Sequence, residues 1–269
     1  MDRITQQEHG VLLLRVPLLE DTGLVQAAFT TRVGGVSQGE CSSMNFSFSR
    51  KDEPEAVREN FRRLCETLGT RYDRLVITRQ VHEDRVLEPE EADLNGHYTG
   101  CGTTQEADAL ITDRPGWALV KHAADCVPIL LLDPVQKAVA AVHAGWRGTV
   151  ASIAQKTVRR MAERFGSRPQ DILAAIGPSI GPCCFQVGED VAHAFRSAFP
   201  QMNVALGEGS ETFIDLWACN KSQLLEAGLL PGHVSLSGLC TACHPEWFYS
   251  HRRDQGRCGA MVGVIALVE

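Results

Sequence analysis

The sequence predicts a mixed α/β fold, and three observations predict it. Strand-like segments alternate with helix-like segments along the chain. Several of the strand-like segments are apolar at nearly every position, which is typical of strands covered on both faces by other layers. The 269 residues are 44% apolar and 22% charged, ordinary values for a globular chain that can bury a full core. We expect one domain spanning residues 1–269.

Eight segments are predicted as strands because they are short and apolar. Most of them lack the alternation of apolar and polar residues that marks a strand with one face in water. They therefore predict buried sheets with further layers on both sides. They cover residues 24–31, 74–78, 109–112, 117–121, 127–132, 138–143, 172–176 and 261–268.

The first predicted helix follows the strand at residues 24–31. Asp52 and Pro54 are typical of a helix start, and Gly69 is typical of a helix end. The apolar residues between them recur at helical spacing, so one face of this helix packs on the core. These residues are Val57, Phe61, Leu64, Cys65 and Leu68.

Three further helices are predicted in the second half of the chain. One covers residues 149–165 and ends at Gly166, since apolar residues from Val150 onward form a stripe at helical spacing. The next covers residues 189–199, and a less regular one begins near Asp215. The order of strands and helices is that of a mixed α/β fold.

Charge and hydropathy exclude several classes of protein. The net charge of −7 argues against a generally basic nucleic-acid binder. No apolar run approaches the ~18 residues of a membrane span, and the apolar stretch near the N-terminus is broken by Arg15 and lacks a cleavage site. We therefore expect a cytoplasmic protein that binds neither membranes nor nucleic acid, and by default a monomer. Its ten cysteines would stay thiols in a reducing compartment, most of them as small buried residues.

His82, Cys126 and His143 carry the sharpest chemistry in the chain. Two imidazoles and one thiolate suit Zn²⁺, and three protein ligands leave a fourth position for water or substrate, as in catalytic zinc sites. His143 ends an apolar strand, and the following Gly-Trp-Arg-Gly leads into a helix. Ligands of α/β folds bind at such carboxyl ends of strands. The three residues are far apart in sequence, so their spacing alone does not establish the site.

At these motifs the chain resembles the laccase-domain family, also described as the polyphenol-oxidase-like or peptidoglycan-editing-factor family. The resemblance runs from about residue 28 to the C-terminus, and the combination and order of the motifs are highly specific. The motifs are Thr31-Arg32-Val33-Gly34-Gly35-Val36-Ser37, Arg79-Gln80-Val81-His82, Ala107-Asp108-Ala109, Ala124-Asp125-Cys126-Val127-Pro128, His143-Ala144-Gly145-Trp146-Arg147-Gly148, Ile176-Gly177-Pro178-Ser179-Ile180, Cys240-Thr241 and Phe248-Tyr249-Ser250-His251-Arg252-Arg253-Asp254.

This resemblance implies a single laccase-like domain of mixed β-sheets flanked by helices, layered as an α/β/β/α sandwich. It implies a catalytic zinc bound by His82, Cys126 and His143. It also implies a purine nucleoside phosphorylase acting on adenosine, inosine and methylthioadenosine, and an adenosine deaminase. The family's older name implies copper-dependent oxidation of phenols. Nine histidines without a His-x-His pair could hardly ligate four coppers, although one Cu²⁺ could replace zinc at the same three ligands.

Phosphorolysis needs groups that bind phosphate and groups that bind the nucleoside. Guanidinium groups bind oxyanions bidentately, although about half of the candidate arginines are expected to be ordinary surface or structural residues. Asn45 and Gln80 could bind ribose hydroxyls or the purine edge, and Asp125 could orient a ligand or cap a turn. The arginine candidates are Arg32, Arg147, Arg252 and Arg253.

Other functions remain open at this point. Cys126 could be the nucleophile of a cysteine hydrolase, or the zinc could hydrolyse an amide such as a cell-wall precursor. A metabolite-binding regulator without turnover is a further alternative. The run Cys240-Thr241-Ala242-Cys243-His244 spells C-x-x-C-H, a haem-attachment pattern that normally needs export. As a zinc half-site it lacks a second C-x-x-C, and the adjacent Cys183-Cys184 are expected to be packed thiols.

Overall fold

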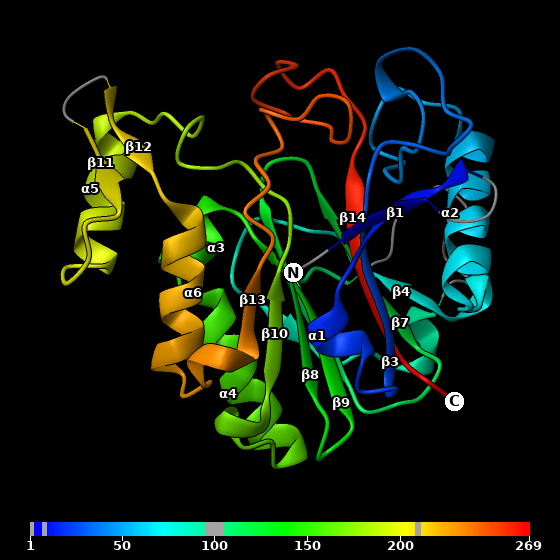
Figure 1. The fold of residues 1–269 in the computed structure, drawn as a ribbon, viewed down its shortest axis with the longest axis horizontal. Helices are drawn as coiled ribbons and strands as arrows, with labels where there is room; N and C mark the ends of the chain where they lie inside the picture. The colour runs from blue at the N-terminus through cyan, green and yellow to red at the C-terminus, as the bar shows by residue number, and fades with distance from the viewer. Residues whose placement is uncertain (1–2, 7–9, 95–104, 208–210) are drawn as a thin grey trace.

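The fold has four layers, in the order α/β/β/α, as Figure 1 shows for a computed structural model that describes residues 3–6, 10–94, 105–207 and 211–269. Two six-stranded sheets pack against each other, and helices cover their outer faces. The predicted mixed α/β class and the layered sandwich are therefore confirmed. Among the described residues no helix is long and apolar enough to cross a membrane.

The first sheet is mostly antiparallel. Its central strand, β14 (Met261–Leu267), pairs antiparallel with β3 (Val25–Thr30) on one side and with β7 (Ala118–Ala123) on the other. The outermost strand beyond β7 runs parallel to it. Across the sheet the order is β1 (Arg3–Gln6), β2 (Leu12–Arg15), β3, β14, β7 and β4 (Leu75–Ile77).

The second sheet is built around the hairpin of β8 (Val127–Asp133) and β9 (Ala138–Ala144). All seven positions of each strand are buried, because β9 contributes Val142 to the outer core and Ala141 to the core between the sheets. The order is β13 (Val234–Leu236), β10 (Leu173–Ile176), β8, β9, β6 (Ala109–Thr112) and β5 (Val86–Leu87), and a separate pair joins β11 (Ala205–Leu206) to β12 (Phe213–Ile214).

The core between the sheets is closely packed around Phe29. Its ring leaves no room for a side chain at Gly177, where a Cβ atom would lie 2.5 Å from the ring, and it also packs against Gly263. Glycine at position 177 therefore lets a loop of the second sheet approach a strand of the first. Apolar side chains from both sheets, including Leu119 and Leu130, fill the remaining space.

Each helix that covers an outer face packs on its sheet through a stripe of apolar side chains. The predicted first helix is α2 (Pro54–Leu68), which packs on the first sheet and ends at Gly69 in the left-handed conformation. Asp52 does not cap it, since Glu53 is the N-cap residue. The second sheet is covered by α3 (Trp146–Val150), α4 (Ile153–Phe165) and α6 (Leu216–Glu226), the last capped by Asp215, and α5 (Glu189–Ala198) packs beyond them against α3.

The predicted helix over residues 149–165 is wrong in two respects, because helical structure begins earlier, at Trp146, and is not continuous. The chain breaks after α3 because Ser152 adopts a positive φ of 62°, and α4 starts afresh behind it. The eight predicted strands all form, within two residues of their predicted ends. The short elements α1 (Pro17–Glu20), β1, β2, β5, β11, β12 and β13 were not predicted, although the apolar stretch before Arg15 forms β2.

Lys121 is an exception to the apolar core, because it is buried on β7 with only 1% of its surface exposed. Its Nζ donates hydrogen bonds to the hydroxyl of Thr78 and to the backbone oxygen of Ala107. Burial lowers its pKa from 10.5 to about 7, although the charge of Asp108 opposes this shift. The folded chain therefore gives up this proton at a lower pH than the unfolded chain does.

Between these two pKa values the unfolded chain binds more protons, so this lysine makes folding more favourable as the pH rises. We expect Lys121→Met to stabilise the protein most at about pH 6, where the buried ammonium is charged, and least at about pH 10. Urea denaturation of both proteins across this range measures the difference. A difference in unfolding free energy that does not change with pH would contradict this account.

Candidate metal centre

The three predicted ligands lie together. The ligand atoms of His82, Cys126 and His143 are all within 4.8 Å of one another. The two imidazole rings are 4.9 Å apart between centroids and nearly perpendicular, at 87°. Residues separated by up to 61 positions thus meet at one point, as a metal centre requires.

The pairing of β8 with β9 brings Cys126 to His143. In this hairpin Pro128 lies opposite His143, and Val127 lies opposite Ala144. Cys126 immediately precedes β8, so it lies beside the point where β9 ends. Two ligands are therefore fixed by the register of one antiparallel pair.

Asp108 orients His143. It lies just before β6, which pairs with β9, and it is fully buried. Its Oδ1 is 2.8 Å from His143 Nδ1, and its backbone oxygen accepts a hydrogen bond from His143 N at 2.7 Å. A carboxylate at Nδ1 keeps the proton on that nitrogen, which leaves Nε2 free to bind a metal ion.

The same carboxylate holds the loop of His82. It accepts hydrogen bonds from three successive backbone N–H groups, those of Val81, His82 and Glu83, at 3.0–3.1 Å. This loop is bent tightly, since His82 has a positive φ of 63°. The hydrogen bonds offset the energetic cost of that conformation and fix the backbone position from which the His82 side chain extends.

The protonation of the site follows from burial. Burial alone would raise the pKa of Asp108, but the hydrogen bond and charge of His143 and the backbone N–H groups hold it below its usual value. Burial lowers the pKa of His143. Burial also raises the pKa of the Cys126 thiol to about 12, helped by the charges of Asp125 and Asp108. The carboxylate is thus ionised and the imidazole neutral, whereas a metal ion must displace the thiol proton.

Asp125 ties the cysteine segment to other loops. Its φ is 92°, and its carboxylate accepts hydrogen bonds from Thr241 Oγ1 at 2.6 Å and from Arg252 N at 2.7 Å. Its backbone oxygen accepts one from Ile180 N at 2.9 Å. The carboxylate of Asp125 therefore bonds the loops that contain Thr241 and Arg252, and these hydrogen bonds position the backbone next to Cys126.

Gly145 leaves space beside the ligands. A Cβ atom there would lie 3.2 Å from His82 Cδ2 and 3.3 Å from Cys126 Sγ. A larger residue would crowd the point where the three ligand atoms converge. The donor set, a soft thiolate with two imidazoles, and the oriented His143 fit a transition-metal ion such as zinc or copper.

A cavity of about 810 Å³ opens over the three ligands. Aromatic side chains and cationic or polar side chains share its lining, a combination that suits a small ligand with a flat ring and polar substituents. The lining includes His82, Cys126 and His143, the aromatic residues Phe48, Trp146 and Phe185, and the polar residues Ser47, Ser49, Arg50, Thr78, Arg79, Gln80, His122, Asp125, His251 and Arg252.

Two of the five predicted substrate-binding residues line this cavity. Arg252 donates from Nη1 to Gln186 O at 2.7 Å. The side-chain amide of Gln80 bonds the backbone of His122: Gln80 Oε1 accepts from His122 N at 2.7 Å, and Gln80 Nε2 donates to His122 O at 3.0 Å. Burial lowers the pKa of His122 itself to about 4, so this cavity residue is neutral.

The other three predicted residues are not among the described residues that line it. Arg32 donates to the backbone oxygens of Ser42 and Pro245 and lies over the ring of Tyr249. Asn45 is fully buried, and its amide bonds Ser47, Asp52 and Ala260. Arg147 is exposed and lies over the ring of Trp146, 4.2 Å from its centre. Arg253, the fourth arginine candidate, is paired with Asp254.

Sequence reasoning missed several residues of the site. Asp108 was noted only as part of a motif, because its role depends on hydrogen bonds to residues 25–27 positions earlier. Arg50, Phe48 and Phe185 line the cavity without any local signal in the sequence. Only the Asp-after-Ala motif before a buried strand could have drawn attention to Asp108.

Comparison with known proteins gives a consistent family. The family described as "Multi-copper polyphenol oxidoreductase laccase" matches residues 26–268. A relative from Deinococcus radiodurans named purine nucleoside phosphorylase is 42% identical over 258 residues, covering 96% of this chain and 94% of that protein. One of the same name from Bacteroides thetaiotaomicron is 41% identical over 247 residues, covering 88% and 90%. The crystal structure of YlmD from Geobacillus stearothermophilus matches over the whole of both chains, with a TM-score of 0.91 and 34% identity.

The role of Asp108 gives a direct prediction. We expect Asp108→Asn to weaken zinc binding at His82, Cys126 and His143 by about 10–100-fold, because the amide cannot accept all four hydrogen bonds or hold the charge of a carboxylate. Competition with a coloured chelator measures this affinity. The matched control is Asp133→Asn, a fully buried carboxylate that also accepts backbone N–H groups but lies at the far end of β8. Equal zinc affinity in wild type and Asp108→Asn would contradict the assigned role.

Proposed function

The chain belongs to the family described as multi-copper polyphenol oxidoreductase laccase, and because relatives carry the name purine nucleoside phosphorylase, we propose that it is a zinc-dependent enzyme of that kind. Its substrates would be adenosine, inosine and methylthioadenosine together with phosphate, and the same site would also deaminate adenosine. The observation that carries the proposal is the meeting of His82, Cys126 and His143 in the lining of a cavity of about 810 Å³. Relatives that carry the name purine nucleoside phosphorylase align with most of the chain.

The zinc ion belongs at the three converging ligands. His143 is held with Nε2 free by Asp108, and Cys126 becomes a thiolate when the ion displaces its proton. When bound, zinc supplies a Lewis acid that polarises an oxygen atom of a substrate. Cu²⁺ competes well for the same donors, so the metal in the purified protein depends on supply.

Two kinds of side chain in the cavity lining suit the two substrates, the nucleoside and phosphate. Phe48, Trp146 and Phe185 offer apolar faces for the purine, while Arg50 and Arg252 offer guanidinium groups for phosphate. Arg252 keeps further N–H donors beyond the one it uses on Gln186. Its backbone is held by Asp125, next to the ligand Cys126.

Phosphorolysis makes and breaks one bond each. A phosphate oxygen forms the bond to ribose C1′, and the bond from C1′ to the purine nitrogen breaks with its electron pair leaving on the base. Holding both reactants in one cavity lowers the entropic barrier to this step. Cationic side chains bind phosphate in the required place, and polar groups of the lining relieve the negative charge on the departing purine.

The competing functions predicted from the sequence are less well supported. Burial raises the pKa of Cys126 to about 12, which disfavours a free thiolate nucleophile of a cysteine hydrolase. Within the described parts of the chain, the potential metal groups are this one and a group of four cysteines, which offers no histidine cluster for several coppers. Zinc-dependent hydrolysis of an amide would use the same ligands, and its products distinguish it from phosphorolysis.

Product analysis tests the proposal. Zinc-loaded protein is incubated with adenosine, with and without phosphate, and the products are separated by chromatography. We expect free adenine and ribose 1-phosphate only when phosphate is present, and inosine in its absence. His143→Ala should reduce both reactions at least about 100-fold, because one ligand and its hydrogen bond to Asp108 are lost.

The control is His193→Ala, a histidine on α5 that is not among the described ligands or lining residues. It should leave both reactions unchanged. Unchanged adenosine in every tube would contradict the proposed function, and activity that survives in His143→Ala would contradict the assigned metal centre.

A further inference from the structure

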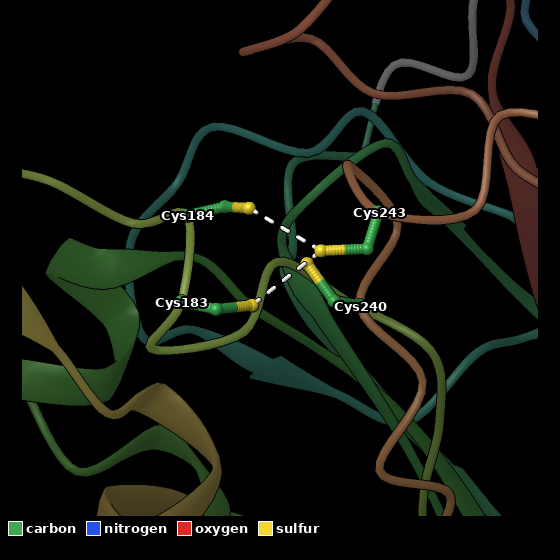
Figure 2. Close-up of side chains that lie close together, drawn as sticks. All are labelled: Cys183, Cys184, Cys240 and Cys243. Carbon is green, nitrogen blue, oxygen red and sulfur yellow. Dashed lines mark hydrogen bonds between the residues drawn. The ribbon is translucent and has the colours of Figure 1, made fainter.

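A second group of sulfur atoms lies outside the centre described above. The sulfur atoms of four cysteines are all within 4.8 Å of one another. Cys243 Sγ is 3.6 Å from Cys183 Sγ and 3.5 Å from Cys184 Sγ. Figure 2 shows the four side chains converging from two separate loops. They are Cys183, Cys184, Cys240 and Cys243.

The fold brings these loops together at one edge of the second sheet. Strands β10 and β13 are parallel neighbours, so the segments that follow them leave the sheet on the same side. The two segments continue to pair, since Ser179 bridges Cys240 in parallel and Thr241 N donates to Ser179 O at 3.0 Å. The cysteines then lie on two facing turns, closed by hydrogen bonds from Cys184 N to Gly181 O and from Cys243 N to Cys240 O.

The distances fit a single tetrahedral ion. With a Zn–S distance of about 2.3 Å, two ligands of a tetrahedral site are separated by about 3.8 Å. The observed separations of 3.5 and 3.6 Å are close to this value. A disulfide would need about 2.05 Å, and adjacent cysteines such as Cys183 and Cys184 form a strained ring. Thiolates around an iron–sulfur cluster bind different iron atoms and would be spread more widely.

We propose that Cys183, Cys184, Cys240 and Cys243 bind a structural Zn²⁺ ion, separate from the centre at His82, Cys126 and His143. Four thiolates complete the tetrahedron and leave no position for substrate, which is the arrangement of structural zinc sites. The site is closed by ligands from two loops and is partly exposed, so the ion can enter from solvent. The C-x-x-C that lacked a partner in the sequence is completed by the adjacent pair Cys183-Cys184.

A backbone N–H group supports a thiolate at Cys240. Gly181 N donates to Cys240 Sγ at 3.2 Å, as backbone amides do around metal-bound sulfur. Four thiolates and one Zn²⁺ carry a net charge of about −2. The side chains of Arg252 and Arg253 hydrogen-bond to the two loops: Arg252 Nη1 donates to Gln186 O and Arg253 Nη1 donates to Thr241 O.

An ion here would join two loops that support the catalytic cavity. The first loop contributes Ile180 and Phe185 to the cavity lining, and Ile180 N bonds Asp125. The second contributes Thr241, which bonds the carboxylate of Asp125. Both loops therefore position the residue before the ligand Cys126, and the zinc would hold them together without touching substrate.

The test counts zinc in protein purified anaerobically from zinc-supplemented cells, by mass spectrometry of the elements. We expect about two zinc ions per chain in wild type, about one in Cys240→Ser/Cys243→Ser, and about one in His143→Ala. Cobalt substitution identifies the remaining site, because an all-sulfur site gives stronger sulfur-to-metal charge-transfer bands than a site with two imidazoles. The all-sulfur spectrum should persist in His143→Ala and be lost in Cys240→Ser/Cys243→Ser.

Cys65→Ala, which removes a buried thiol on α2, is the control and should keep both ions. Should the double cysteine variant fail to fold, His143→Ala still decides, because it must retain one ion with the all-sulfur spectrum. No metal in His143→Ala, iron in place of zinc, or a disulfide among the four cysteines would overturn the proposal. These counts do not depend on whether the chain phosphorolyses nucleosides.

Discussion

The carboxylate of Asp108 connects the parts of the candidate metal centre. It accepts three backbone N–H groups from the loop of His82 and faces Nδ1 of His143, so two ligands share one buried anion. A buried carboxylate is costly unless its oxygens are paired, and here they are paired by these four groups. The loop of the first sheet and the last residues of β9 are thereby fixed to each other. Cys126 joins them through the register of β8 and β9.

This arrangement depends on two sheets packed face to face. β4 of the first sheet leads to His82, whereas β8 and β9 of the second sheet carry Cys126 and His143. The close packing around Phe29 sets how the sheets meet, and loops from both sheets then line one cavity. His82 and Asp125 both adopt a positive φ, which bends their loops sharply. The carboxylate of Asp108 holds His82 through its backbone N–H group, whereas Asp125 is held by the hydrogen bonds of its own carboxylate.

Much of the fold could be predicted because the buried strands are apolar on both faces and Gly69 and Gly166 end their helices. The break at Ser152 could not be predicted, since serine is no strong stop signal and residues other than glycine seldom adopt a positive φ. The three candidate metal ligands were predicted from their chemistry and motifs, and the structure brings them together. The hydrogen bonds of Asp108 and the meeting of Cys183-Cys184 with Cys243 were not predicted, because each depends on contacts between segments far apart in sequence. Asn45 was a plausible substrate-binding residue by its type, yet in the structure its side-chain amide hydrogen-bonds to other residues of the protein.

The central claim is that metal and nucleoside meet in the cavity over His82, Cys126 and His143. It is tested most directly by diffraction at the zinc absorption edge from crystals soaked with adenine and ribose 1-phosphate. We expect an anomalous peak between the three ligands and density for the products in the same cavity, beside Phe48, Phe185 or Arg252. An absence of anomalous signal at these ligands, or products bound elsewhere on the chain, would contradict the claim.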